Sequence, residues 1–390
     1  MKKLLILLLF CFISLPFAND NLSDVVKNGE LALQLHLVHD ELNYDDSAND
    51  SYGTIAGIIL NYKTKPYGGS FVNLTFGSNN PVFAQKNPQN SELLSQDEKS
   101  IDSLIEGYLY FQEDKHSFKL GKQQLYTPLL NSTNSRVLPY SFSGFSYMLR
   151  SDFLKVVLGS VNEQKRANER VFSSEFDGGN GENGIFFGGL ELKNIGFESK
   201  AYYYQAKDMF DSIFFQVDKN GFLKTWRYYL GAQYITTGKN GSGKNINTLS
   251  NDGGSDVKIN ALRVGTGYKN AGLIVAYSKN NGSNGLAKAY AGKAELFTDS
   301  LIDFDITDGY EEIVSFRFKY DFSKELTSKI IYNDTSFKKQ ENPNNFDSLF
   351  VEMDYEYAKN SYFNVGYEHM DKEYKSSDID YLRVVLTKRF

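Results

Sequence analysis

The chain has 390 residues, with 42 Lys and Arg against 48 Asp and Glu, so its formal net charge is −6. This acidic balance argues against a nucleic-acid partner, and the single cysteine, Cys11, excludes a disulfide framework. Tyr (27) and Phe (30) are abundant, yet the mean hydropathy is −0.42. Abundant aromatic residues in a polar chain are expected when only every second residue of a strand meets lipid.

Residues 1–18 resemble a secretory signal peptide. Two lysines follow the first methionine, an apolar stretch runs to Phe17, and Ala18 is a small residue ahead of a polar segment. The apolar stretch is too short to cross a membrane as a mature helix. We therefore expect a removable signal peptide at 1–18 and one exported domain at 19–390.

From about residue 30 onwards, apolar and polar residues alternate with a period of two. In 31–37 every second residue is leucine, and in 314–320 Val, Phe, Phe and Tyr alternate with Ser, Arg and Lys. Such alternation gives a strand one apolar and one polar face, and about ten such residues cross a bilayer at a tilt. Eighteen candidate strands follow in chain order: 30–39, 53–64, 68–77, 100–113, 116–124, 142–151, 153–162, 184–193, 195–205, 209–218, 221–236, 256–268, 271–280, 309–320, 325–337, 346–357, 361–372 and 379–390.

The connections between these strands alternate in length. We expect tight turns near 65–66, 113–115, 152, 194, 218–221, 269–271, 321–324 and 359–360, with one more short link near 207–208. The other connections are mostly long and polar, as in 78–99, 163–183, 238–256 and 281–308. Tight turns that alternate with long loops are typical of a bacterial outer-membrane barrel, with the turns in the periplasm. The sequence therefore predicts an all-β fold, a transmembrane antiparallel barrel of about 18 strands in the outer membrane of a Gram-negative bacterium.

The last strand carries a second indication of the same location. Phe390 ends the chain behind an alternating apolar face made by Leu382, Val384 and Leu386. This pattern resembles the signal by which the barrel-insertion machinery recognises outer-membrane proteins. We therefore expect two partners, outer-membrane lipid and that machinery. An ordinary strand that ends in phenylalanine is the alternative interpretation.

The stretch from 119 to 150 resembles one porin family. A strand ends in Leu120, Gly121 and Gln123, a loop with a proline follows, and Arg-Val-Leu-Pro at 136–139 precedes an aromatic residue and a glycine. The segments at 106–110 and 156–159 fit the same pattern. Together they resemble the OprD-type family of substrate-selective outer-membrane porins.

The resemblance implies a monomeric barrel of 18 strands with loops that fold inward. It also implies a row of basic residues on the lumen wall that guides carboxylate-bearing solutes. In this chain the inward loop would be 125–141, with Arg136 and Pro139 at the constriction.

Strand periodicity separately predicts which charged residues line the lumen, namely those opposite the apolar face. A charge that faces lipid near the midplane costs about 2–4 kcal/mol, which favours the lumen for charged side chains. The predicted basic ladder consists of Lys119, Arg150, Lys155, Lys200, Arg227, Arg263, Arg317, Lys319, Lys329 and Arg383. The predicted acidic side consists of Glu352, Asp354 and Glu356, with Glu368 on the next strand. A lumen that carries both positive and negative charges suits carboxylate or zwitterionic solutes. The alternative role of these residues is to form wall salt bridges that hold the barrel open.

The acidic loop 281–308, with Glu295 and Asp299, is open to three interpretations: an acidic vestibule, a cation site or a solvated loop. We expect the solvated loop because no ligand spacing is present. We also expect no catalytic residue, cofactor or metal. The glycines at 238–245 resemble a phosphate-binding loop but lack its final Ser or Thr, and the four histidines have no metal-binding spacing.

The sequence thus predicts a porin for passive, partly selective uptake of small hydrophilic solutes, carboxylate-bearing or zwitterionic, and no enzyme. One alternative is a surface adhesion or structural barrel with a closed lumen. The other is a trimeric general-diffusion porin, which requires an apolar patch for subunit contact on adjacent strands.

Overall fold

The structure is a computed structural model of the whole chain. It describes residues 22–45, 49–83, 85–87, 93–95, 97, 99–132, 137–174, 184–241, 256–286, 294–299, 309–338, 345–373 and 378–390. The expected signal peptide at 1–18 and the expected constriction residue Arg136 lie outside this part of the chain.

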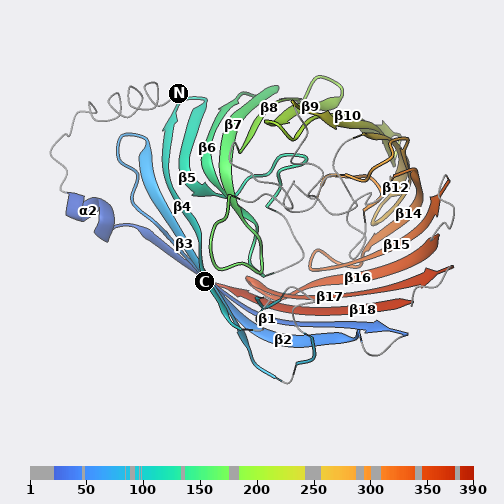
Figure 1. Cartoon of the computed structure of the whole chain (residues 1–390), viewed down its shortest axis with the longest axis horizontal. Coiled ribbons are helices and arrows are strands. Elements are labelled where there is room, and N and C mark those ends of the chain that lie inside the picture. Colours follow the sequence, from blue (N-terminus) through green and yellow to red (C-terminus); the bar gives the residue numbers. More distant parts are fainter. Residues whose placement is uncertain are drawn as a thin grey trace.

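The chain forms a closed antiparallel barrel of 18 strands, which confirms the predicted fold class (Figure 1). Each strand pairs with its neighbours in sequence, and β1 and β18 pair with each other to close the ring. The strands are β1 (Glu30–Tyr44), β2 (Ser51–Lys63), β3 (Ser70–Pro81), β4 (Ile101–Glu113), β5 (His116–Gln123), β6 (Ser141–Arg150), β7 (Leu154–Lys165), β8 (Ile185–Leu192), β9 (Glu198–Ala206), β10 (Phe210–Leu223), β11 (Trp226–Lys239), β12 (Val257–Tyr268), β13 (Ala271–Asn280), β14 (Glu311–Asp321), β15 (Leu326–Phe337), β16 (Phe346–Ala358), β17 (Ser361–Lys372) and β18 (Ile379–Arg389).

One helix is described, α2 (Leu22–Lys27), ahead of the first strand. The backbone N–H of Lys65 donates to the carbonyl of Val25 at 3.1 Å, and the hydroxyl of Tyr62 donates to the carbonyl of Val26. These bonds tie the helix to the turn end of β2. No helix in the described part of the chain is long and apolar enough to cross a membrane.

The predicted tight turns lie at one end of the barrel, with one correction, and the short link predicted near 207–208 joins β9 to β10 at the other end. The turn expected at 218–221 is strand, because β10 pairs with β11 without interruption as far as the Leu223 and Trp226 pair. Asp-Lys-Asn-Gly is a strong turn signal, but Gly221 has another role here. A Cβ on Gly221 would lie 2.6 Å from the Tyr228 hydroxyl oxygen. The glycine therefore makes room for the ring of its cross-strand partner, and the turn follows at 224–225.

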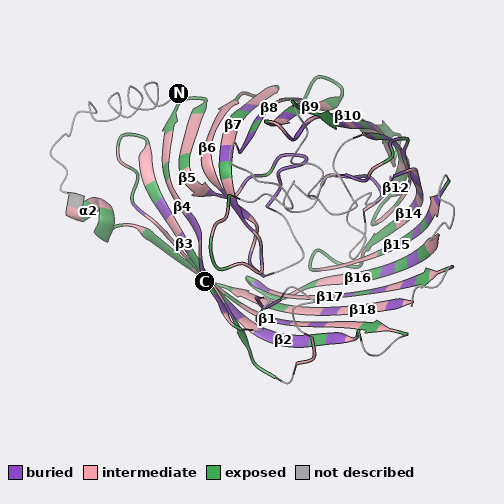
Figure 2. Cartoon of the chain, viewed as in Figure 1, coloured by how far each residue is buried: buried purple, intermediate pink, exposed green. Residues whose placement is uncertain are grey.

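The two faces of the strands differ as the alternation predicts. Large exposed apolar side chains such as Leu230, Leu262 and Phe316 share one face of the sheet. Buried residues gather on the chain segments inside the ring and on the strands around β8 to β10 (Figure 2). The apolar outer face is the surface that lipid covers.

A buried ion pair lies on the inner face at the closing seam. Asp40 of β1 and Arg383 of β18 are direct register partners, with 0% and 6% of their surfaces exposed. The Arg383 Nε atom lies 3.8 Å from the Asp40 Oδ1 atom, and neither carboxylate oxygen of Asp40 has a hydrogen bond among the described residues. Arg383 is therefore the main compensation for a buried negative charge.

Replacement of Arg383 by methionine is predicted to destabilise the barrel by about 3–5 kcal/mol, because Asp40 is then a buried charge without a partner. Urea unfolding of protein refolded into lipid vesicles measures this change. The control is Arg389→Met at the exposed end of the same strand, expected to change stability by less than about 1 kcal/mol. Equal effects of the two variants would contradict the role of the pair.

Candidate functional site

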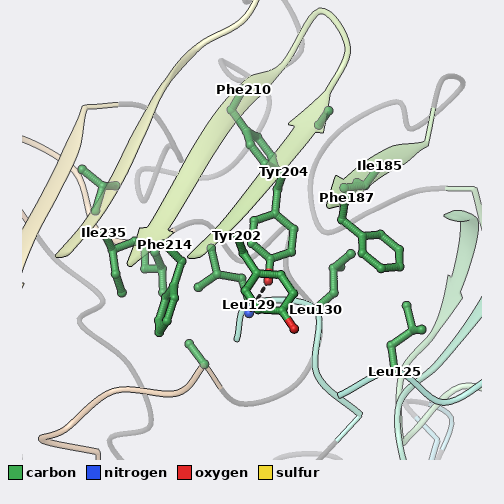
Figure 3. Close-up of a cluster of buried hydrophobic side chains, with 14 of the residues drawn as sticks. Leu125, Leu129, Leu130, Ile185, Phe187, Tyr202, Tyr204, Phe210, Phe214 and Ile235 are labelled. Carbon is green, nitrogen blue, oxygen red and sulfur yellow. Dashed lines mark hydrogen bonds between the residues drawn. The ribbon is translucent and has the colours of Figure 1, made fainter. Parts of the chain in front are cut away.

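The loop between β5 and β6 lies inside the barrel and is anchored on the β8–β10 wall. Its residues Leu129 and Leu130 are fully buried in a cluster with aromatic side chains from those strands (Figure 3). The backbone N–H of Leu129 donates to the Tyr204 hydroxyl at 3.2 Å, and that hydroxyl donates to Thr127 Oγ1 at 3.0 Å. The cluster includes Phe187 of β8, Tyr202 and Tyr204 of β9, and Phe210 and Phe214 of β10.

The same loop is anchored on the β1–β4 wall through its second half. Val137 and Leu138 pack in a separate buried cluster with Val38 of β1 and Ile55 of β2. The described part of the loop therefore reaches from one wall of the barrel to another. A chain segment in this position occupies part of the barrel interior between the two walls.

Glu106 of β4 fixes the point where this loop begins. Its Oε1 atom accepts the backbone N–H of Gln124 at 3.1 Å, and its Oε2 atom accepts the Thr75 hydroxyl at 3.1 Å. A register shift between β3 and β4 interrupts the alternation here, so that the adjacent residues Ile105 and Glu106 are both buried, and Glu106 is not among the predicted lumen residues. Its hydrogen-bond partners come from two other parts of the chain, so only the folded structure brings them together.

A second inward segment, 294–299, lies against the first loop. The backbone N–H of Glu295 donates to the carbonyl of Pro128 at 3.0 Å, and the Glu295 carboxylate pairs with Lys200. Asp299 pairs with Arg317 at 3.2 Å. The expectation of a solvated acidic loop is therefore wrong for Glu295 and Asp299, because lumen cations bind both carboxylates and hold the segment inside.

The strand register places all ten predicted ladder cations on the lumen face, opposite the exposed apolar residues. Most of them lie in the half of the barrel nearest the tight turns, within four residues of a strand end. The positions by strand are Lys119 on β5, Arg150 on β6, Lys155 on β7, Lys200 on β9, Arg227 on β11, Arg263 on β12, Arg317 and Lys319 on β14, Lys329 on β15 and Arg383 on β18.

Seven of these ten cations have a carboxylate partner. These pairs join Lys155 to Glu191 (2.7 Å), Lys200 to Glu295, Arg263 to Asp218 (2.5 Å), Arg317 to Asp299 (3.2 Å), Lys319 to Asp321 (2.9 Å), Lys329 to Glu352 (2.6 Å) and Arg383 to Asp40 (3.8 Å). Five of these salt bridges lie within the wall, and two join the wall to the inward segment 294–299. Glu191 and Asp218 lie on strands between those that carry the ladder cations. Positive and negative side chains therefore alternate around most of the wall.

The predicted acidic residues of β16 also have partners within the wall. Glu352 and Asp354 both contact Lys329, at 2.6 and 3.3 Å, and the Asn364 amide donates to both of them. Glu356 accepts the backbone N–H of Asn360 at 3.1 Å, which stabilises the adjacent turn. These three carboxylates are therefore engaged by protein groups.

Within the described part of the chain, three ladder cations have no carboxylate partner. The Lys119 ammonium lies over the Tyr108 ring, 4.7 Å from its centroid. The Arg150 guanidinium donates to the Met148 sulfur at 3.5 Å, and the Arg227 guanidinium donates to a turn carbonyl at 3.1 Å. Their contacts are with neutral groups, so no salt bridge neutralises any of these three cations within the described part of the chain.

Lys119 and Arg150 line one cavity of about 160 Å³ beneath the start of the inward loop, together with Lys155. Gln124 and the half-exposed ring of Tyr126 close its other side. No Asp or Glu lines this cavity. The cavity is therefore an electropositive subsite with an aromatic wall.

A second cavity, of about 360 Å³, lies between the same loop and the β1–β4 wall. It is lined by Glu106, His36 and Asn61, and Pro139 of the predicted constriction lies here. Gln124 and Tyr126 line both cavities. A basic and an acidic subsite thus meet at one point of the inward loop.

Outside the membrane-spanning strands, a charged contact ties two loops of the rim together. The Arg170 guanidinium lies 3.0 Å from Asp97 and donates to the Ser100 carbonyl at 2.9 Å. Hydrogen bonds from Ser95 and from Arg170 hold the pKa of Asp97 well below its usual 3.8. Asp97 therefore stays ionised in mildly acidic medium, and the tie between the loops persists there.

Leu129→Ala is predicted to weaken the anchor of the inward loop by about 2–5 kcal/mol, because it leaves a cavity in a fully buried cluster. The loop then leaves the β8–β10 wall more often. Single-channel recordings in planar bilayers are expected to show larger current fluctuations than the wild type. Leu190→Ala, on the lipid face of β8, is the control and should leave the recordings unchanged; no difference between the variants would argue against the anchor.

Comparison with known proteins agrees with this architecture. A family model described as "outer membrane porin, OprD family" matches residues 109–327. The fold is similar to OccK9 (OpdG) of Pseudomonas aeruginosa, with a TM-score of 0.83 and 16% identity over 94% of this chain and 99% of that one. OpdK of P. aeruginosa, solved with vanillate, gives 0.79 and 14% over 94% and 99%. OccAB4 of Acinetobacter baumannii gives 0.80 and 17% over 93% and 98%. No curated protein sequence matches the chain.

Proposed function

This chain belongs to the OprD family of outer membrane porins, and we propose that the solutes it admits are small carboxylates. Porins of this family mediate substrate-selective uptake, and the barrel is accordingly an integral outer-membrane channel in a lipid environment. The observation that carries the proposal is the cavity lined by Lys119, Arg150 and Lys155 without any acidic residue.

The charge balance of the lumen supports this assignment. Salt bridges neutralise most lumen cations, whereas Lys119 and Arg150 meet only neutral groups among the described residues. An Arg guanidinium binds a carboxylate through two parallel hydrogen bonds, and such charge-assisted bonds are stronger than neutral ones. A solute that passes the inward loop therefore meets its strongest complementary charge in this cavity.

The exposed ring of Tyr126 favours solutes that carry an apolar body beside the carboxylate. This ring is 59% exposed and lies next to the cations of the cavity. An aromatic carboxylate stacks on such a ring while its charged end reaches the cations. OpdK, which shares the fold, was solved with vanillate, a compound of this chemical kind.

Zwitterionic solutes form a second candidate class, favoured by the neighbouring cavity. Glu106 lines that cavity and lies on the other side of Gln124 and Tyr126 from the cations. A molecule with both an ammonium and a carboxylate group finds opposite charges on the two sides of one loop segment. Arrangements of this kind set pore selectivity by contact with the solute at close range.

Three further assignments belong to the same proposal. The barrel acts as a monomer, residues 1–18 are removed as a signal peptide, and the terminal strand ending in Phe390 is recognised by the insertion machinery. The family consists of channel porins, and the proposal gives this chain a transport role without a catalytic one. A closed adhesion barrel would give no conductance steps in a planar bilayer, and a trimer would be captured by crosslinking in detergent.

Arg150→Gln and Lys119→Gln are each predicted to weaken current block by benzoate about tenfold, which corresponds to about 1.4 kcal/mol of lost binding energy. The reason is the loss of a cation that no protein carboxylate neutralises. Titration of benzoate against single-channel current measures the apparent dissociation constant. Anion preference, read from the reversal potential in a salt gradient, should fall in the same variants.

Lys319→Gln is the matched control, because Asp321 neutralises this lysine at 2.9 Å. It removes one lumen cation on another strand and should change benzoate block less than twofold. If all three variants change block equally, the lumen responds to net charge alone. That result would contradict a specific role of this cavity in binding the solute.

A further inference from the structure

The lipid-facing side of β10–β13 contains a hollow of about 510 Å³. Eight outward residues line it as two rows of direct cross-strand partners. One row is Val217, Ala232, Leu262 and Tyr277, and the row nearer the turns is Lys219, Leu230, Val264 and Val275. The smallest of these side chains is Ala232, flanked by larger residues on both neighbouring strands. The hollow is therefore an apolar groove with Ala232 at its floor.

The single charged group on the outer face of this groove is Lys219. It is exposed and has no anionic partner among the described residues. A lysine on the lipid face near the midplane costs about 2–4 kcal/mol, and its flexible side chain lowers that cost by reaching toward the headgroups. Toward the turns, the next outward pair is Gly221 and Tyr228. The Tyr228 ring lies over Gly221, so a tyrosine is the next outward side chain that the lysine meets on the way to the headgroups.

An aromatic boundary marks the membrane surface just below this point. Trp226 and Tyr268 are cross-strand partners whose rings stack at 4.8 Å on the outer face. Aromatic residues of this kind gather at the level of the lipid headgroups. The turns after β10 and β12 add Lys224 and Lys269 at the headgroup end of these strands.

From this geometry we propose that the groove binds one phospholipid of the inner leaflet. An acyl chain fills the hollow over Ala232, and the phosphate contacts the ammonium group of Lys219 beside Trp226. The inner leaflet follows from the position of Lys219 on the turn side of the groove, because tight turns of outer-membrane barrels are periplasmic. Anionic headgroups bind best, since Lys219, Lys224 and Lys269 leave the rim with excess positive charge.

The chain carries its own probe for this site, because Trp226 is its only tryptophan. Full-length protein is refolded into phosphatidylcholine vesicles that contain a fixed fraction of brominated lipid. Bromine near the headgroup end of the acyl chain quenches tryptophan fluorescence on contact. Quenching by brominated phosphatidylglycerol, relative to brominated phosphatidylcholine, reports the preference for an anionic lipid at Trp226, expected to be roughly fivefold.

Two variants separate the headgroup contact from the groove. Lys219→Gln removes the proposed phosphate contact and should lower the preference to about twofold or less. Ala232→Phe fills the floor of the groove and should lower it similarly while leaving every charge in place. Ala201→Phe, an exposed lipid-facing alanine on β9, is the control and should keep the wild-type preference.

Each outcome decides the proposal. Equal quenching by the two lipids in the wild type overturns it, and so does an unchanged preference in Ala232→Phe, which would leave only general surface charge. A dimer that crosslinks through β10–β13 and is lost in Ala232→Phe would assign the face to a second copy of the chain. Heat-modifiable migration on gels verifies that each variant is folded, and Ala232→Leu replaces the phenylalanine variant if that one fails.

Discussion

A strand inside a hydrocarbon layer must satisfy every backbone N–H and C=O group through a neighbouring strand, because lipid offers no hydrogen bonds. In this chain the requirement is met only when β18 pairs with β1. Closure then determines which side chains meet lipid and which meet the lumen, since alternate residues of a strand point to opposite faces. Closure also brings Asp40 of β1 and Arg383 of β18 together, because these two residues meet only across the seam.

Closure also brings many charged side chains together inside the barrel. The arrangement of the lumen depends on which of these charges form salt bridges. Most of the predicted ladder cations have a carboxylate partner, either on the barrel wall or on the inward segment 294–299. These pairs support the wall and hold chain segments inside the barrel. In the proposed function, selectivity toward solutes depends on the few ladder cations without a salt bridge, Lys119 and Arg150 foremost, under a loop anchored at two walls.

The outer face meets the opposite requirement, because its side chains contact lipid and should therefore carry no charge. Large exposed apolar side chains cover most of this face, so Lys219 in the groove over β10–β13 is unusual, and the proposed phospholipid would offset its charge. Aromatic rings on the turn side place that lysine close to the headgroup level. The two proposals thus assign charged contacts to both faces of the barrel, to solutes inside and to lipid outside.

The sequence by itself determined the strands, their number, the order of turns and loops, and the face on which the ladder cations and the acidic residues of β16 lie. These properties depend on alternation with a period of two, which is local and can be read from neighbouring residues. The turn predicted at 218–221 was wrong because a turn signal is also local, whereas the length of a strand depends on how far it pairs with the neighbouring strand. Tertiary structure alone decided which cations are neutralised. Lys200 and Glu295, for example, are 95 positions apart in the sequence. They meet because the barrel is closed, and a local sequence pattern cannot predict such a contact.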